Sequence, residues 1–204
     1  KLLKYEVEHR EIARKDKLIK NAGFYTLKAF ETFQFDEVTL PATLTADSLK
    51  NLEFIDSKTN LVMYGNVGTG KTHLSVALGV EACKKRLNVK FFRTSALVNK
   101  LAEAKKSGTL SALMKQLNKT DLLIFDEWGY VPLDRIGAQL LFEVVSECYE
   151  RKPLIINTNI EFSRWVNVFY DEQMTGAIID RLLHHCHLLL FPGQSNRMRE
   201  SGLT

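Results

Sequence analysis

The sequence predicts an α/β fold in which helices cover both faces of a central parallel sheet. Five short apolar runs, each the length of a buried strand, alternate with longer stretches of helical periodicity between residues 61 and 191. Regular alternation of this kind is typical of parallel strands joined by crossover helices. The 204 residues are 45% hydrophobic and 25% charged, so the chain can bury a core and is not largely disordered.

The expected elements follow in order along the chain. Residues 1–22 predict a charged, partly amphipathic helix, and residues 23–50 predict an irregular segment with several aromatic side chains. We assign residues 1–50 to an N-terminal helical and aromatic appendage and residues 51–204 to the α/β domain. In that domain we expect strands at 61–64, 89–92, 122–125, 154–157 and 188–191, with helices near 71–86, 95–106, 109–118, 134–151 and 175–185.

The composition excludes several classes of protein. Cys83, Cys148 and Cys186 form no CxxC motif and cannot all pair, which disfavours a disulfide scaffold and favours a reducing compartment. No apolar run approaches the roughly 20 residues of a membrane span, so we expect a cytoplasmic protein. The formal net charge of +4 permits a nucleic-acid partner without requiring one.

A glycine-rich motif lies between the first expected strand and the helix that follows it. Glycines let backbone N–H groups surround phosphates, and the helix N-terminus favours anions. We expect Lys71 to reach the β- and γ-phosphates of ATP and the Thr72 hydroxyl to bind Mg²⁺; the alternative is a glycine-rich turn with no ligand. The motif is Gly65-Asn66-Val67-Gly68-Thr69-Gly70-Lys71-Thr72, which fits the phosphate-loop pattern G-x-x-x-x-G-K-[ST].

Two carboxylates follow the third apolar run. Ligands of open α/β sheets bind outside the carboxyl ends of the strands, which places Asp126 beside the phosphate loop. We expect Asp126 to orient the Mg²⁺ shell through water, and Glu127 to accept a proton from the water that attacks the γ-phosphate. The alternative is a solvated strand end. The pair disfavours a metabolite kinase, which needs no water-activating carboxylate.

Polar and basic residues nearer the C-terminus complete the candidate site. Asn159 is our first choice, and Thr158 the second, for an amide or hydroxyl that positions the attacking water; turn capping is the alternative. An arginine stays charged and binds phosphate through two N–H groups. We expect Arg181 to reach the γ-phosphate of a neighbouring subunit and Arg197 to contact the nucleotide of its own subunit, although spacing alone also fits ordinary surface arginines.

The motifs arrive in the order typical of an AAA+ ATPase with its P-loop core: phosphate loop, Asp-Glu strand, Asn-Thr-Asn tip and late Asp-Arg-Leu. Four segments, at 64–82, 122–129, 165–185 and 191–202, resemble more closely the IstB family of transposition helper ATPases from bacterial insertion sequences. That family is related to the DnaC helicase loaders and to the initiator DnaA. The resemblance implies ATP hydrolysis, a homo-oligomer on duplex DNA, and assistance to the transposase of the same element.

The resemblance also implies roles for individual residues. Two departures are visible: Asn196 stands where Tyr is common before the last arginine of the pattern, and Val67 stands where Pro is usual. The matching positions are residues 65–73 for the nucleotide, with His73 included and Lys71 and Thr72 as the Walker A pair; Asp126 and Glu127 as the Walker B pair; Asn159 as sensor 1; Arg181 as the arginine finger; and Arg197 as sensor 2.

A basic helical pair is the expected DNA-binding surface. Residues 95–119 predict two short helices divided at Ser107-Gly108, with no aromatic residue among them, which favours the duplex backbone over stacking on single strands. The alternative is a solvated basic face. The N-terminal helix is a second candidate, but its acidic residues offset much of its charge. The candidate lysines are Lys100, Lys105, Lys106, Lys115 and Lys119.

Two other patterns are given structural interpretations. The run His184-His185-Cys186-His187 has no second cluster to complete a tetrahedral metal site, so we expect none there. The aromatic residues Phe30, Phe33 and Phe35 are expected in the core, with a clamp on a neighbouring subunit as the alternative.

Three competing functions remain at this point. A DnaC-like helicase loader would share the superfamily and differ in its partner. A small-molecule kinase should lack Glu127 and Arg181 and should carry an arginine-rich lid. A DNA-binding module with an inactive nucleotide site is disfavoured, because the residues of the phosphate loop and the Asp-Glu pair are intact.

Overall fold

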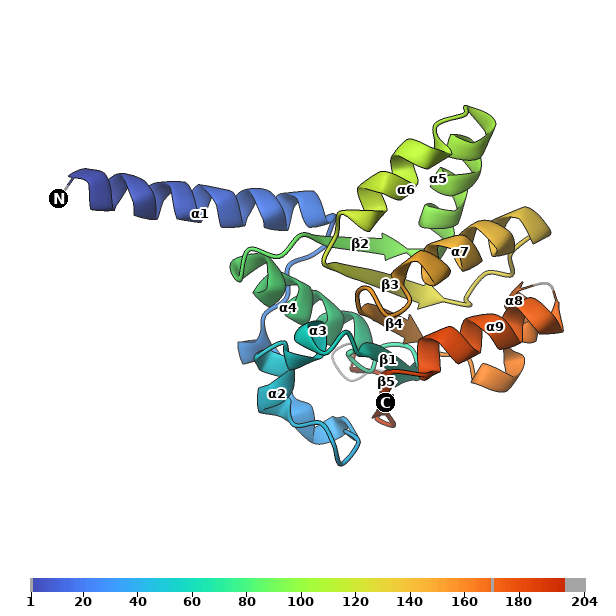
Figure 1. Ribbon diagram of the computed structural model, residues 1–204. Coiled ribbons are helices and arrows are strands. Elements are labelled where there is room, and N and C mark those ends of the chain that lie inside the picture. The colour runs from blue at the N-terminus through green and yellow to red at the C-terminus, as the bar shows by residue number, and fades with distance from the viewer. Residues whose placement is uncertain (1, 170, 197–204) are drawn as a thin grey trace.

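A computed structural model describes residues 2–169 and 171–196 of the chain, and its centre is a parallel sheet (Figure 1). The strand order is β2-β3-β4-β1-β5, and every pairing is parallel. All five expected strands are confirmed, each with one to three additional residues. Their bounds are β1 Asn60–Gly65, β2 Val89–Arg93, β3 Leu122–Trp128, β4 Leu154–Thr158 and β5 Cys186–Phe191.

Helices connect the strands where the periodicity predicts them. Asp134 and Asp171 cap the starts of α7 and α9, because each carboxylate accepts a hydrogen bond from a backbone N–H three residues later. The long helices are α1 Leu2–Ala22, α4 Lys71–Lys84, α5 Thr94–Lys106, α6 Leu110–Asn118, α7 Arg135–Cys148 and α9 Glu172–Leu183. The short ones are α2 Ala46–Lys50, α3 Glu53–Asp56 and α8 Val166–Phe169, with 3₁₀ turns η1 Phe30–Thr32, η2 Phe35–Glu37 and η3 Phe162–Arg164.

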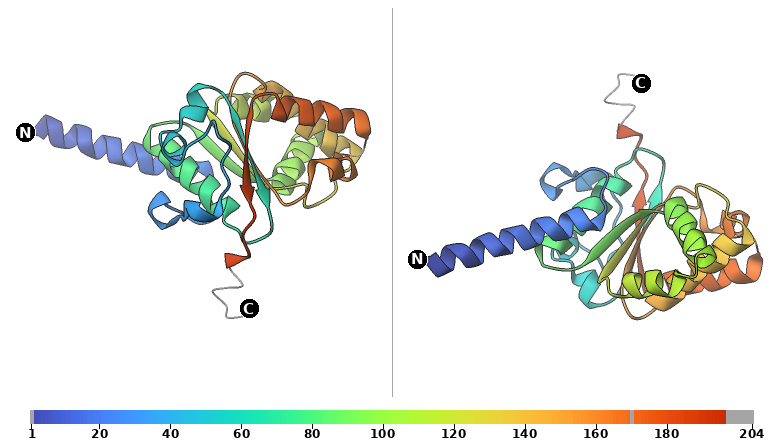
Figure 2. Two further views of the ribbon diagram at one scale, coloured as in Figure 1. Left: turned by 90° about the horizontal axis from the view of Figure 1, so that it is seen from below. Right: turned by 90° about the horizontal axis from the view of Figure 1, so that it is seen from above.

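The sheet separates two hydrophobic clusters, so the domain has three layers (Figure 2). Alternate residues of one strand point to opposite faces: Val62 belongs to the cluster under α5, α6, α7 and α9, whereas Leu61 and Met63 belong to the cluster under α4. The predicted fold, a parallel sheet flanked by helices, is therefore confirmed. Within the described residues, no helix is both long and apolar enough to cross a membrane.

The N-terminal region divides into a projecting helix and a segment that returns to the domain. Helix α1 extends away from the body, and its last residue, Ala22, is buried against the α4 layer (Figure 1). Phe30 and Leu44 are buried in the same cluster. Thr39 exchanges backbone hydrogen bonds with Leu190 of β5 in an isolated antiparallel bridge. The division of the chain at residue 50 remains a prediction, and the returning segment shares the core of the domain.

Candidate functional site

The phosphate loop joins β1 to α4 at the carboxyl edge of the sheet. Two of its glycines are required by the backbone. A Cβ at Gly65 would collide with the carbonyl oxygen of Phe191, and Gly70, which precedes α4, has φ +99° in the left-handed region. The loop is therefore held against β5 on one side and opens directly into the N-terminus of α4, where the helix dipole favours an anion.

Lys71 lies inside this loop. Its Nζ donates hydrogen bonds to the carbonyl oxygens of Gly65 and Asn66, at 2.7 and 2.6 Å. The side chain is buried. A buried ammonium needs acceptors around it, and the loop supplies them from its own backbone, so the positive charge stays at the start of α4.

Thr72 and Asp126, which are 54 residues apart in sequence, meet at the carboxyl edge. The Thr72 hydroxyl donates to the two carboxylate oxygens of Asp126 at 3.0 and 3.1 Å. Asp126 is buried near the end of β3, and the Thr94 hydroxyl donates to its backbone oxygen. A hydroxyl and a carboxylate are hard oxygen ligands, so the pair fits a Mg²⁺ ion.

Asn157 is a residue of this site that the sequence reasoning missed. Its Nδ2 donates to Asp126 Oδ1 and to the Ser75 hydroxyl, both at 2.9 Å, and the side chain is buried on β4. Among the described residues, Oδ1 of this amide has no hydrogen-bond partner. The signal was present in the sequence: an asparagine inside an apolar strand must find partners in the core.

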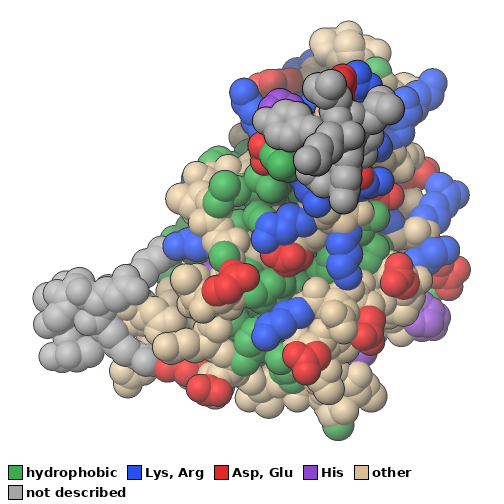
Figure 3. All heavy atoms as spheres, turned by 90° about the vertical axis from the view of Figure 1, so that its left-hand side faces the viewer, with side chains coloured by type: hydrophobic (Ala, Val, Ile, Leu, Met, Phe, Trp, Pro, Cys, Tyr) green, Lys and Arg blue, Asp and Glu red, His purple; other side chains and the backbone are tan. Residues whose placement is uncertain are grey.

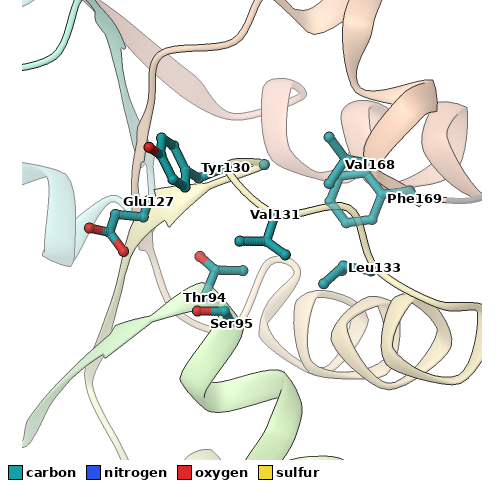
Figure 4. A pocket seen from close by; sticks show the side chains of 9 residues that line it. Thr94, Ser95, Glu127, Tyr130, Val131, Leu133, Val168 and Phe169 are labelled. Carbon is teal, nitrogen blue, oxygen red and sulfur yellow. The ribbon is translucent and has the colours of Figure 1, made fainter.

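Glu127 occupies a bulge. After Phe125 the register between β3 and β4 shifts, and Glu127 has φ +56°, rare for a residue with a side chain. Strand β3 therefore continues to Trp128 instead of ending before the carboxylates. The bulge leaves the Glu127 carboxylate about half exposed, with one oxygen 3.6 Å from Nε of Arg93. Figure 4 shows it at one end of a hollow that Val168 and Phe169 line at the other end.

The two candidates at the tip of β4 have different surroundings. The Thr158 hydroxyl is buried and donates to the backbone oxygen of Trp128 at 3.0 Å, so it serves the local turn. Asn159 is exposed in the bend that follows the strand. Of the pair, Asn159 is the one open to a ligand at the carboxyl edge.

The segment at residues 26–37 forms one wall of a pocket over the phosphate loop, which the sequence reasoning did not anticipate. His73 connects the two parts: its Nε2 lies 3.0 Å from the Ala29 oxygen and 3.2 Å from the Thr32 hydroxyl, and its ring packs against Phe33. Of the aromatic residues expected in the core, Phe30 is buried, and Phe33 and Phe35 pack at the edge of the same cluster.

The C-terminal segment reaches the same loop. The Asn196 backbone N–H donates to the Gly68 oxygen at 3.0 Å. Arg197, expected to contact the nucleotide, lies outside the described residues.

Arg181 lies at the opposite edge of the sheet. It belongs to the last turn of α9, just before β5 begins, whereas the phosphate loop follows the end of β1. Strands β1 and β5 are parallel and in register over six residues, a length of about 20 Å. Arg181 Nη1 donates to the Ala177 oxygen at 3.0 Å, and the guanidinium lies 4.8 Å from the centre of the Phe142 ring. The residue thus lies at the amino end of the sheet, away from the phosphate loop of its own chain.

The profile of the family described as IstB-like ATP binding proteins matches residues 1–204. The chain belongs to this family. Two relatives of the IstB-like chain carry names that describe them as ATP-binding proteins of insertion sequences. That of IS232 from Bacillus thuringiensis is 35% identical over 98% of this chain and 80% of its own length. The protein of IS5376 from Geobacillus stearothermophilus is 34% identical over 100% of this chain and 81% of its own length.

Solved structures similar to the IstB-like chain share its fold at low sequence identity. DnaI matches with a TM-score of 0.65 at 16% identity, over 89% of this chain and 93% of its own. The DnaC helicase loader matches with a TM-score of 0.59 at 21% identity, over 84% of this chain and 96% of its own. AMPPCP-bound DnaA from Aquifex aeolicus matches with a TM-score of 0.60 at 22% identity, over 76% of this chain and 46% of its own. These neighbours are AAA+ proteins, so the IstB-like chain has the AAA+ fold.

The candidate DNA-binding lysines of the IstB-like chain lie on a helical hairpin. Helices α5 and α6 project from the body (Figure 1), and they turn at Gly108, which has φ +72°. A hollow between the helices is lined by Lys100, Glu103 and Gln116, among others. By comparison, the side of the molecule from which α1 projects carries acidic and basic side chains interspersed with one another (Figure 3). All five candidates are exposed: Lys100, Lys105, Lys106, Lys115 and Lys119.

Proposed function

We propose that this chain binds and hydrolyses ATP with Mg²⁺, that it does so in a homo-oligomer on duplex DNA, and that it assists a transposase. The observation that carries the proposal is the junction of Thr72 with Asp126 beside the phosphate loop. The hydroxyl and the carboxylate would hold Mg²⁺ beside the start of the helix where the phosphates of ATP would bind.

Each residue of the carboxyl edge has a chemical task in this proposal. Lys71 binds the β- and γ-phosphate oxygens, for which it exchanges the loop carbonyls that it contacts. Thr72 and Asp126 hold Mg²⁺, which when bound neutralises charge on the phosphates. Glu127 accepts the proton of the attacking water, and its exposure in the bulge gives that water access. Asn159 orients the same water from the tip of β4.

The remaining catalytic group comes from a second subunit. Strands β1 and β5, about 20 Å long, separate the end of α9 that carries Arg181 from the phosphate loop of the same chain. A guanidinium at that distance does not contact its own γ-phosphate. If it stabilises the transferring phosphoryl group, it must do so in a neighbour, which makes ATP hydrolysis dependent on assembly.

The DNA and transposase parts of the proposal have different support. The exposed lysines of α5 and α6 offer a positive surface to the phosphate backbone. The curated relatives are named as ATP-binding proteins of insertion sequences, mobile elements that also need a transposase. A DnaC-like helicase loader is the second candidate, because DnaI and DnaC match the chain over nearly their full solved length. Genes beside this one would separate the two: a transposase gene supports the first, a helicase gene the second.

One experiment tests the core of the proposal. ATP turnover is measured with and without duplex DNA, and the size of the protein is measured in the same samples by light scattering. We expect turnover and size to rise together when DNA and ATP are both present. Turnover by a protein that stays monomeric would contradict the shared site, and absence of any ATP binding would contradict the whole proposal.

A further inference from the structure

Three metal-ligating side chains gather at the edge of the sheet opposite the phosphate loop. Glu150 lies in the turn between α7 and β4, and His184 and His185 lie at the junction of α9 with β5. The atoms that these side chains offer lie within 4.8 Å of one another, and all three residues are exposed. The third ligand therefore comes from a turn that is 34 residues away in sequence from the nearer histidine, so the histidine run alone could not indicate it.

The backbone holds both turns in place. His184 ends α9 in a helical conformation, with its N–H bonded to the Asp180 oxygen at 3.0 Å. The His185 oxygen accepts a hydrogen bond from the Asn60 N–H at 2.8 Å, which fixes it to the start of β1. Glu150 has φ +56°, a conformation that few residues other than glycine adopt.

A second residue orients one of the histidines. The Tyr149 hydroxyl lies 3.0 Å from Nδ1 of His184, and the rings of His184 and His185 pack edge to face with centroids 4.3 Å apart. With Nδ1 engaged by the tyrosine, Nε2 of His184 is the nitrogen that remains for a ligand. Metal-binding histidines have this arrangement as a rule, with the other ring nitrogen hydrogen-bonded to a neighbouring group.

We propose that Glu150, His184 and His185 bind one Zn²⁺ ion, with water as a fourth ligand. Two imidazoles and one carboxylate suit Zn²⁺, whereas Mg²⁺ and Ca²⁺ prefer oxygen ligands alone. The ion ties the end of α9, three residues beyond Arg181, to the turn that follows α7. It thereby fixes the segment that carries Arg181, and this role is separate from ATP binding.

The test is a titration of the whole chain, freed of metal by a chelator, with Zn²⁺ and without nucleotide. We expect one equivalent to bind and a rise in Tm on binding. Co²⁺ should bind the same site and give the visible absorption of a tetrahedral ion. His185→Gln and Glu150→Gln should each weaken Zn²⁺ binding at least tenfold, since loss even of a supporting hydrogen bond typically costs 10–100-fold. Tyr149→Phe should weaken it within that range.

The matched control is His187→Gln, which changes a histidine of the same run that lies outside the cluster; its Nδ1 is 3.5 Å from the Thr43 hydroxyl. It should bind Zn²⁺ like the unchanged chain. The exposed turn variant Glu150→Gln removes a ligand without touching α9, and its circular dichroism reports whether the fold is intact. No stoichiometric binding by the unchanged chain would overturn the site. So would equal losses in His187→Gln and His185→Gln, or full affinity in a folded Glu150→Gln variant.

Discussion

The two edges of the central sheet hold their functional side chains in different ways. At the carboxyl edge, Lys71, Asp126 and Asn157 are buried and joined to their neighbours by hydrogen bonds of 2.6–3.1 Å. At the opposite edge, His184 and Glu150 are exposed. A site that acts within one subunit is fixed by the packing of that subunit, whereas groups that serve a partner or an ion from solvent must remain accessible.

Within the carboxyl edge, two adjacent carboxylates also differ in how they are held. Asp126 is held by Thr72 and Asn157 from two other elements, and Glu127, the next residue, is half exposed beside Arg93. The bulge in β3 creates this difference between adjacent residues. In the proposed mechanism, the bulge lets Asp126 serve as a fixed ligand while Glu127 meets water.

The largest expected effect comes from removing the Arg181 guanidinium at the edge opposite the phosphate loop. Arg181→Ala should bind ATP nearly normally as a monomer and lose DNA-stimulated turnover by roughly 10³–10⁵-fold, the range that arginine fingers supply in GTPases. The reason is that the lost guanidinium acts only on a neighbour. Turnover is measured by phosphate release, and affinity by titration with a fluorescent ATP analogue.

Mixing this variant with Lys71→Ala gives the matched control. Each subunit then lacks one half of the shared site, and a Lys71→Ala subunit can lend its Arg181 to a neighbour that still binds ATP. Some activity should return in the mixture. If the two variants co-assemble and remain inactive, Arg181 does not act across the interface.

A second change separates the two carboxylates. Glu127→Gln should retain ATP affinity and lose about 10²–10⁴-fold in turnover, because the amide keeps the shape of the side chain and removes the base. ATP-dependent assemblies of this variant should last longer, which size-exclusion chromatography in ATP would detect. Hydrolysis at the rate of the unchanged protein would exclude Glu127 as the base.

A smaller effect distinguishes the buried asparagine from the exposed one. Asn157→Ala leaves Asp126 and Ser75 without an amide donor in the core, so unfolding in urea should show a loss of about 1–3 kcal/mol. Asn159→Ala should cost less than about 0.5 kcal/mol and should lower turnover. Equal losses of unfolding free energy in the Asn157→Ala and Asn159→Ala variants would contradict the structural difference between the buried and the exposed asparagine.

The smallest expected change is at the α5–α6 hairpin. Reversal of Lys105 and Lys106 to Glu should weaken duplex binding, and the slope of log affinity against log salt should fall by about 0.9 per lost phosphate contact. Fluorescence anisotropy at several salt concentrations measures both the affinity and the slope. The comparison variant reverses Lys17 and Lys20 of α1; a larger change there would move the DNA-binding surface to the N-terminal helix.

The sequence predicted the features whose signals are local. The apolar runs specify the strands, and the phosphate loop is a contiguous pattern that needs no partner to be found. Asn157 was missed because its role depends on a hydrogen bond to Asp126, which lies 31 residues earlier. Glu150 was missed because its partners in the proposed metal site follow only after β4, α8 and α9. The wall at residues 26–37 was missed because nothing in an irregular aromatic segment says which loop it will cover.

The parallel register of β1 and β5 has a consequence for the symmetry of any assembly of the kind proposed. A subunit that receives an arginine at one edge and gives one at the other has two unlike contact faces. A contact through a twofold axis would complete a site only if one face held both the arginine and the nucleotide site. A head-to-tail contact joins the two unlike faces and, repeated with the same rotation at every step, closes into a ring or continues as a helical filament. In a filament, the subunit at one end always carries a nucleotide site with no arginine donor, so hydrolysis there waits for the next subunit to arrive.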